Sequence, residues 1–149
     1  MNTQNQDDPR IKALQNYADV YARLTPGTLD ALRAVTTPDI CFTDPFTTLN
    51  GQDALCAYMG KMFEDAEDAK FIISHHMIST DMGFLRWHFS AKIPVIGQWN
   101  FIGMSEVTFN ADGTLIASHT DHWDSGSKFY AKIPVLGWFI RRLAKKVAH

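Results

Sequence analysis

The chain has 149 residues, 46% of them hydrophobic, and a formal net charge of −2 at pH 7. This length and apolar content predict one domain with a hydrophobic core. The near-neutral charge argues against nucleic-acid binding by the whole domain, because domains that bind nucleic acid usually carry a basic excess.

The ends of the chain and its cysteines indicate the expected compartment. Residues 1–9 lack the basic and apolar regions of a signal peptide, and no apolar run reaches the ~20 residues that a membrane span requires. Cys41 and Cys56 form no C-x-x-C pair, so we expect buried thiols rather than a disulfide. Together these features predict a cytoplasmic protein with a flexible tail over residues 1–9.

Helical patterns occupy the first half of the chain. Apolar residues recur at helical spacing over residues 10–24, and a shorter helical piece follows over 28–35 before "TTPDICFTDPF" reads as extended. Asn50 and Asp53 resemble a capping arrangement for a second long helix. The apolar side of that helix is expected to carry Leu55, Met59, Met62, Phe63 and Ala66.

Four segments with alternating hydrophobicity fill most of the second half. They are "KFIISHHMIST", "GFLRWHFSAK", "QWNFIGMSEVTF" and "TLIASHTDHWD". Turn signals at "DMG" and "NADG" separate them, so we expect a curved antiparallel sheet. The stretches "AKIPVIGQW" and "AKIPVLGWF" are similar over only nine residues, which indicates chance or parallel turn chemistry rather than an internal repeat.

The alternation also predicts which side chains point inward. In the third segment, Trp99, Phe101 and Ser105 share the inner face. In the last segment one side carries Leu115, Ala117, His119, Asp121 and Trp123, and the other side includes Ile116 and Ser118. If the side with Trp123 faces inward, His119 and Asp121 need partners, because burying them unpaired is costly. A hydrogen-bonded pair near a barrel rim and a contact to a ligand both satisfy that need.

A metal site would need three or four converging ligands, and the available set is His119, Asp121 and His75. The chain contains no H-x-H or H-E-x-x-H spacing. We therefore expect no metal.

Three short motifs, in their order and spacing, resemble those of the nuclear transport factor 2-like superfamily. They are "FTDPF" with Gly51 opening the next helix, "FNADGTL" and "DHWD". Relatives in that superfamily include ketosteroid isomerases, SnoaL-type polyketide cyclases and limonene epoxide hydrolases. The resemblance implies an α+β fold, in which a cone-shaped, curved antiparallel sheet wraps around a hydrophobic pocket closed by N-terminal helices. It places this domain over residues 10–127 and leaves residues 128–149 as a C-terminal helical extension.

The resemblance also implies roles for individual residues. Asp44 lies where ketosteroid isomerases keep the carboxylate that shuttles a proton, and Asp121 resembles the last-strand acid/base carboxylate of some cyclases and hydrolases. Ser105 stands where the isomerases have a second acid, and Tyr17 or Tyr21 lies near their tyrosine donor. Further ligand contacts are expected among aromatic and methionine side chains, namely Phe42, Met59, Phe63, Trp87, Phe101 and Trp123.

The resemblance implies an enzyme that moves a proton on a hydrophobic carbonyl compound, as an isomerase or cyclase does, without a cofactor. Asp44 is the expected base, with Asp121 and His119 as polar partners. Asp44 also fits an ordinary turn before Pro45. The alternative function is a non-catalytic ligand-binding or protein-interaction module, because the fold hosts both. Epoxide hydrolysis would need an arginine beside two carboxylates, and Arg86 is expected on the outer face.

Two surfaces predict partners. Ile102, Met104 and Ile116 are expected on the outer face of the sheet, which favours a homodimer. The C-terminal helix is expected to carry an apolar stripe of Leu136, Phe139, Ile140, Leu143 and Val147 opposite Arg141, Arg142, Lys145 and Lys146. We interpret this stripe as packing onto its own domain or a dimer mate, and contact with an anionic membrane surface is the alternative.

Overall fold

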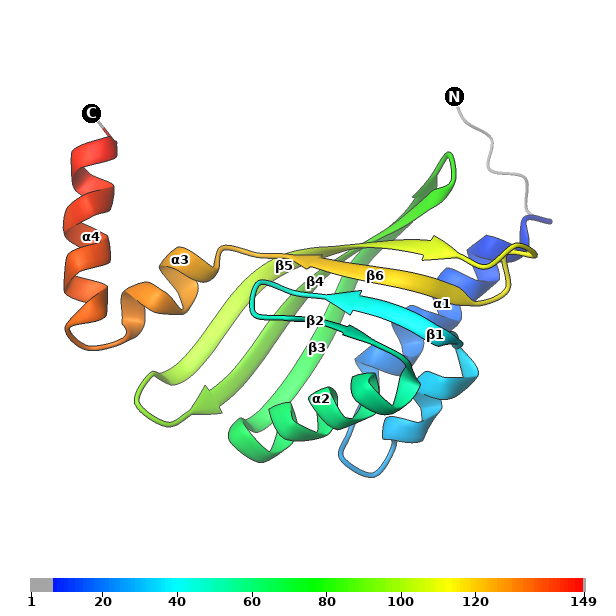
Figure 1. The fold of residues 1–149 in the computed structure, drawn as a ribbon, viewed down its shortest axis with the longest axis horizontal. Helices are drawn as coiled ribbons and strands as arrows, with labels where there is room; N and C mark the ends of the chain where they lie inside the picture. The colour runs from blue at the N-terminus through cyan, green and yellow to red at the C-terminus, as the bar shows by residue number, and fades with distance from the viewer. Residues whose placement is uncertain (1–6, 149) are drawn as a thin grey trace.

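The computed structural model of the chain describes residues 7–148, and a curved sheet of six strands forms its centre (Figure 1). The strands are β1 (Thr36–Thr43), β2 (Thr48–Asn50), β3 (Glu67–Ser79), β4 (Met82–Ile93), β5 (Gly97–Phe109) and β6 (Ile116–His122). Their order across the sheet is β2-β1-β6-β5-β4-β3. Strands β3 to β6 pair antiparallel, as their alternation predicts, whereas β1 runs parallel to β6. The predicted α+β fold is confirmed, with a mixed sheet in place of a wholly antiparallel one.

Strand β3 forms one edge of the sheet and is irregular. Its pairing with β4 shifts register between Glu67 and Lys70 and again between Ile73 and His75. Asp68, within the first irregularity, has a φ of 55°. Bulges of this kind bend a strand and increase its twist, so they help β3 to follow the curvature of the sheet.

Two helices and a 3-10 helix pack against the sheet. They are α1 (Pro9–Ala22), η1 (Leu29–Ala34) and α2 (Gln52–Asp65). Helix α1 begins where the carboxylate of Asp8 accepts a hydrogen bond from the backbone N–H of Arg10 (3.0 Å), and Pro9 supplies a helical φ at the first position. Of the tail expected over residues 1–9, residues 1–6 lie outside the described part of the chain.

Helix α2 does not begin as expected. Its N-terminal cap is Gly51, with a φ of 91°, and no side chain caps the helix. The predicted capping by Asn50 and Asp53 is therefore wrong, because the Asp53 carboxylate instead pairs with the Arg33 guanidinium at 2.7 Å. Cys56, on this helix, is a buried free thiol, and Cys41 in β1 is a half-buried one.

The inward faces of β4 and β5 confirm the predicted alternation. Trp87, Phe101 and Ser105 are all buried on the side that faces the helices. Trp87 pairs with Gly103 across the ladder, and a β-carbon at Gly103 would lie only 2.2 Å from the Trp87 ring. Gly103 therefore provides the space in which the indole of Trp87 lies.

One face assignment in β6 is wrong. Thr108 pairs with Ser118 but its neighbour Phe109 pairs with Ile116, so β6 contains one extra residue, Ala117, at this point. Such a bulge reverses the inward and outward positions on its two sides. Ile116 is consequently buried in the core rather than exposed, while His119 keeps its predicted inward position.

The two similar nine-residue stretches adopt the same local turn. In each, a backbone N–H bonds to the carbonyl two residues earlier, from Ile96 to Pro94 and from Leu136 to Pro134, at 2.8 Å in both cases. The valines between them, Val95 and Val135, have φ values of 71° and 68°, which is a γ-turn with positive φ. Both valines are exposed, at 79% and 75%. The similarity is therefore one of turn chemistry.

After β6 the chain continues as α3 (Ser125–Lys128), the 3-10 helix η2 (Tyr130–Lys132) and α4 (Leu136–Val147). The Trp99 indole N–H donates to the Lys128 carbonyl (2.6 Å), which ties the start of this extension to β5. Helix α4 contacts η2 and projects away from the sheet (Figure 1). The predicted packing of its apolar stripe onto its own domain is therefore not found. No helix within residues 7–148 combines the length and apolar character needed to cross a membrane.

We expect Gly103→Ala to lower the free energy of unfolding by about 1–3 kcal/mol, because its β-carbon would displace the Trp87 ring from a packed site. Chemical denaturation followed by circular dichroism measures this change. Gly27→Ala is the matched control, since its β-carbon would have only the Thr25 hydroxyl oxygen nearby, at 3.9 Å. Equal destabilisation by the two substitutions would contradict the role assigned to Gly103.

Candidate functional site

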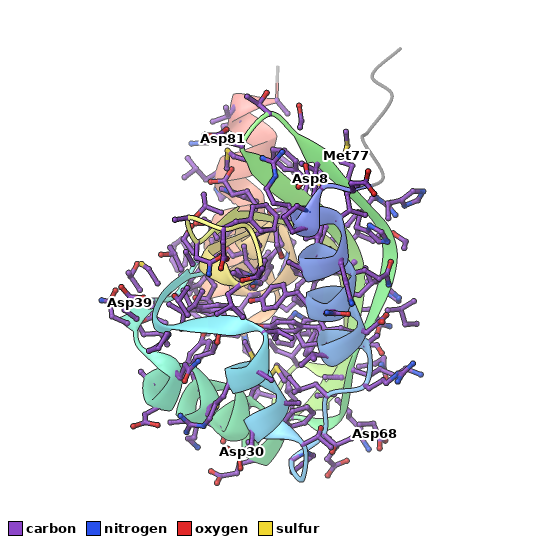
Figure 2. The ribbon with its side chains drawn as sticks, turned by 90° about the vertical axis from the view of Figure 1, so that its right-hand side faces the viewer. Asp8, Asp30, Asp39, Asp68, Met77 and Asp81 are labelled. Carbon is purple, nitrogen blue, oxygen red and sulfur yellow. The ribbon has the colours of Figure 1, made fainter. Side chains whose placement is uncertain are left out.

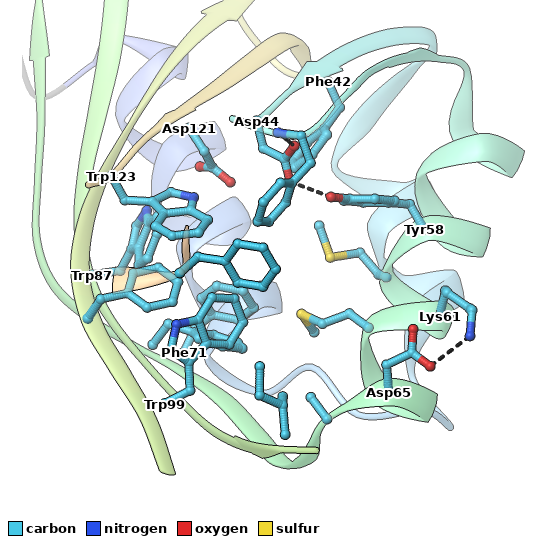
Figure 3. A pocket seen from close by; sticks show the side chains of 18 of the residues that line it. Phe42, Asp44, Tyr58, Lys61, Asp65, Phe71, Trp87, Trp99, Asp121 and Trp123 are labelled. Atoms are coloured by element: carbon cyan, nitrogen blue, oxygen red, sulfur yellow. Dashed lines mark hydrogen bonds and ion pairs between the residues drawn. The ribbon is translucent and has the colours of Figure 1, made fainter. Parts of the chain in front are cut away.

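A cavity of about 460 Å³ lies between the concave side of the sheet and α2 (Figure 3). Its sheet side is aromatic and consists of Phe71, Trp87, Phe89, Trp99, Phe101 and Trp123. Met59 and Met62 of α2 also line the cavity. The rings of Phe101 and Trp123 stack with centroids 4.2 Å apart and planes inclined by 21°. The cavity thus has the apolar character of a site for a small hydrophobic molecule.

The wall contains few charged groups. Asp44 and Asp121 lie among the aromatic residues, and Asp65 pairs with Lys61 at 2.7 Å on α2 (Figure 3). Asp44 and Asp121, which have no lysine or arginine partner within residues 7–148, approach the cavity from different elements. Asp44 follows β1, and Asp121 lies near the end of β6.

Asp121 is held by two donors through the same oxygen. Its Oδ1 accepts from the Ser105 hydroxyl at 2.5 Å and from His119 Nε2 at 2.6 Å. Within residues 7–148 no donor bonds to its Oδ2, and the carboxylate points into the cavity (Figure 3). One oxygen of Asp121 is therefore fixed and the other is available to a ligand.

The bonds to Asp121 continue into the protein on both sides. A neutral His119 that donates from Nε2 to an ionised Asp121 carboxylate accepts at Nδ1, where the Tyr17 hydroxyl lies at 2.6 Å. On the other side, the Trp87 indole N–H donates to the Ser105 hydroxyl at 2.8 Å. His119 and Ser105 are buried, and these bonds satisfy their polar atoms. We call Tyr17, His119, Asp121, Ser105 and Trp87 the polar chain.

Asp44 differs from Asp121 because both of its oxygens are engaged. Oδ1 accepts the backbone N–H groups of Phe46 (2.8 Å) and Thr47 (3.0 Å), and Oδ2 accepts the Tyr58 hydroxyl at 2.5 Å. The first two bonds form the turn before Pro45 that the sequence allows. Burial, followed by the bond to Asp44, raises the pKa of Tyr58. Asp44 thus closes a turn and orients a tyrosine in the cavity wall.

Most of the residues expected at the site lie at the cavity, and some lie behind it. Phe42, Asp44, Met59, Trp87, Phe101, Asp121 and Trp123 line it. Tyr21, Ser105 and His119 border a void of about 10 Å³ behind Asp121, which is too small for an organic ligand. Tyr17 is buried behind this layer and contacts it through His119 and Tyr21.

The expected ligand contacts did not include every side chain that lines the cavity, and some of those expected lie elsewhere. Phe63, expected as a ligand contact, packs against the core and is not among the residues that line the cavity. Tyr58 was not expected there, yet it lines the cavity four residues before Met62 on the same side of α2. The four-residue spacing from Tyr58 to Met62 is the signal that indicates this face of the helix.

The residues considered for a metal or for epoxide hydrolysis do not meet. His75 is exposed and bonds to the Ser74 hydroxyl, and within the described residues no group of three His, Cys, Asp or Glu side chains is placed to hold a metal ion. Arg86 is exposed and also bonds to Ser74, as its predicted outward position requires. No arginine lines the cavity within residues 7–148.

A model of the SnoaL-like domain family matches residues 17–119 of the chain. This span contains the aromatic wall up to β5, together with Tyr17, Ser105 and His119 of the polar chain. Comparison with proteins of curated function gives no sequence match.

Solved structures share the fold at low sequence identity. A hypothetical protein with a ketosteroid isomerase-like fold from Catenulispora acidiphila DSM 44928, solved with trimethylamine, is 14% identical with a TM-score of 0.68, over 83% of this chain and 94% of that one. A candidate SnoaL-like polyketide cyclase from Jannaschia sp. CCS1 is 10% identical with a TM-score of 0.64, over 76% and 84%. An LEH-like epoxide hydrolase from M. tuberculosis is 12% identical with a TM-score of 0.64, over 94% and 96%. These likenesses confirm the nuclear transport factor 2-like fold.

The buried tyrosines predict a loss of stability at alkaline pH. Burial raises the pKa of Tyr17, Tyr21 and Tyr58 above the ordinary value of 10.0. The unfolded chain therefore releases these protons first, so their stabilising effect is complete below that pH and is lost as the pH rises further. Urea unfolding from about pH 8 to about pH 12 measures this decline.

Tyr17→Phe is the control for this titration, because it keeps the ring and removes one ionisable hydroxyl. We expect its free energy of unfolding to fall less steeply above pH 10 than that of the wild type. Identical slopes in the two proteins would mean that Tyr17 does not contribute.

Proposed function

The chain belongs to the SnoaL-like domain family, and from this membership and the cavity we propose that it binds a small hydrophobic carbonyl compound and transfers a proton on it, as an isomerase or cyclase does. The observation that carries the proposal is the geometry of Asp121, whose Oδ1 is held by Ser105 and His119 while Oδ2 has no donor within residues 7–148. A carboxylate fixed in this way is suited to accept a proton from a bound molecule.

The cavity supports a small apolar ligand. Its volume of about 460 Å³ falls within the ~300–1,000 Å³ common for small-molecule sites. The aromatic wall offers ring faces on which a ligand can stack. The cavity has few polar groups that would hold water in place of an apolar ligand. A molecule with one or two fused rings or an equivalent chain matches this space.

In the proposed reaction, a C–H proton next to the ligand's carbonyl moves to Oδ2 of Asp121. The electron pair of that C–H bond forms the enolate, and the proton returns to a different carbon in an isomerase or after ring closure in a cyclase. The indole N–H of Trp123, which has no acceptor among the described residues, is the donor that we assign to the enolate oxygen. His119 and Ser105 act through Asp121 and position it.

Asp44 is the alternative base that the family resemblance implies. Its three hydrogen bonds leave less capacity to accept a ligand proton than Oδ2 of Asp121 has. We therefore assign Asp44 to the positioning of Tyr58, and the experiment below compares the two carboxylates directly.

We expect Asp121→Asn to lower catalysed proton exchange by at least ~100-fold, the usual contribution of a general base. The measurement is loss of the α-proton NMR signal of 2-tetralone in deuterium oxide, with binding followed separately by quenching of tryptophan fluorescence. Asp44→Asn should retain most of the exchange. Asp65→Asn, which changes a cavity carboxylate already paired with Lys61, is the matched control.

Each other outcome of this experiment has a definite meaning. A larger loss with Asp44→Asn than with Asp121→Asn would assign the base to Asp44. Binding of the ketone without exchange in the wild type would contradict turnover and favour the non-catalytic ligand-binding alternative.

We also propose that the chain forms a homodimer through the outer face of the sheet. Ile102 and Met104 of β5 are exposed there, and Ile72 of β3 lies in the same row as Ile102 through His88. Ile116, which is buried, does not belong to this surface. The exposed apolar row is the kind of surface that sheet-to-sheet contacts cover.

Sedimentation velocity tests the dimer. We expect Ile102→Glu to shift the wild-type dimer to a monomer at micromolar concentration, because it places a charge at the centre of the contact. Leu143→Glu, on α4, is the control and should leave the dimer intact. A monomeric wild type, or dissociation by Leu143→Glu alone, would contradict the proposed surface.

A further inference from the structure

Charge is divided unevenly between the domain and its C-terminal extension. Residues 125–149 contain six of the 14 Lys and Arg residues and none of the 16 Asp and Glu residues. The remaining chain therefore carries all of the acidic residues, and Figure 2 shows several of them at its periphery, including Asp30, Asp39, Asp68 and Asp81. The domain is acidic and the extension is basic.

Helix α4 places most of its apolar residues on one side, while Trp138 lies on the cationic side with the Arg142 guanidinium 5.5 Å from its ring centroid. Leu136, Phe139, Ile140, Leu143 and Val147 follow the spacing of one helix face. Within that face Phe139, Leu143 and Val147 are 59%, 63% and 76% exposed. The cations Arg141, Arg142 and Lys145 lie on the opposite side. An apolar face of this kind requires a partner other than water.

The attachment of α4 to the protein involves only its first turns. The Gly137 N–H donates to the Ile133 carbonyl at 2.7 Å, and the Arg141 guanidinium donates to the Ala131 carbonyl. A β-carbon at Gly137 would lie 2.1 Å from the Ala131 carbonyl oxygen, so the helix start is seated tightly on η2. This contact fixes the start of α4, and within residues 7–148 the side chains of Phe139, Leu143 and Val147 remain largely exposed.

Two further exposed apolar side chains, Val95 and Val135, lie at the same end of the molecule. Val95, at the tip of the β4–β5 turn, and Val135, at the start of α4, are both found toward the α4 end of the long axis (Figure 1). Each follows a lysine by three residues, Lys92 and Lys132 respectively. The end of the molecule therefore combines exposed apolar side chains with cations.

We propose that α4 lies in the interface of an anionic lipid bilayer, with its apolar face at the level of the acyl chains and its cations among the phosphate groups. A helix with a polar, cationic side, a narrow apolar face and low overall hydrophobicity is the type that binds membranes in this orientation. The acidic domain is repelled by the same surface, so contact is confined to the basic end.

A second copy of α4 fits the exposed face less well. Two such helices packed along their apolar faces would leave the cations Arg141, Arg142 and Lys145 on the outside, with no acidic residue in either extension to pair with them. Lipid phosphates supply that negative charge. The inference goes beyond the proposed proton transfer and depends on none of the cavity residues.

Co-sedimentation of the full chain with vesicles tests the proposal. We expect binding to vesicles of phosphatidylcholine mixed with phosphatidylglycerol, and at least ~10-fold weaker binding to phosphatidylcholine alone, because anionic lipid attracts each basic residue near the surface. Added salt should weaken the binding.

Three variants separate the contributions. Phe139→Ser with Leu143→Ser removes apolar contacts without changing charge, and Arg142→Gln with Lys145→Gln and Lys146→Gln removes charge without changing the apolar face. Each should lower binding by at least ~10-fold. Met77→Ser, at an exposed apolar position on β3 away from α4 (Figure 2), is the matched control and should bind like the wild type.

Equal binding to both vesicle types, or binding to neither, would overturn the proposal. Dissociation of a dimer by the Phe139 and Leu143 substitutions would assign the apolar face to a second copy and would also overturn it. Because ketone binding is measured without vesicles, failure of the membrane proposal leaves the proposed function standing, and the reverse holds equally.

Discussion

The 2.6 Å hydrogen bond between His119 Nε2 and Asp121 Oδ1 is the interaction on which the site depends. Without this acceptor, the buried N–H of His119 would be unpaired, at a cost of about 1–3 kcal/mol. In the neutral ring that donates from Nε2, Nδ1 is the acceptor that faces the Tyr17 hydroxyl. Since Ser105 and Trp87 complete the polar chain, α1 is joined to β6, β5 and β4 through side chains as well as through packing.

The two cavity carboxylates differ in how their oxygens are used by hydrogen-bond donors. Asp44 receives donors from its own turn and from Tyr58, so its position is fixed on every side. Asp121 receives its donors on one oxygen only, and the other oxygen faces the aromatic wall. The difference arises from location, because a turn provides backbone N–H groups whereas the N–H groups of a strand are used by the ladder.

The sequence was sufficient to predict the inner face of β5, because the alternation along that strand is regular. It was also sufficient for the inward position of His119, which follows the irregular residue Ala117 in β6. It was insufficient for Ile116, because the neighbouring sequence gives no sign of the bulge at Ala117, which reverses the inward and outward positions of β6. On α2, Phe63 follows Met62 by only about 100° of rotation and both are half-buried, so the pattern did not separate them, whereas the four-residue spacing from Tyr58 to Met62 was a usable signal for Tyr58. The bonds from Tyr58 to Asp44 and from Ser105 to Asp121 join separate elements, so the local motifs do not indicate them.

The irregular pairing of β3 has a consequence for how the sheet ends. An open sheet offers unpaired backbone groups along its outer strands, and a long, regular edge can recruit strands from other molecules and begin aggregation. The opposite edge is β2, which spans only Thr48–Asn50 and gives little length for such pairing. β3 spans 13 residues, but its two register shifts interrupt the row of donors and acceptors that an incoming strand would need. The same bulges that curve the sheet therefore protect its exposed edge against uncontrolled growth.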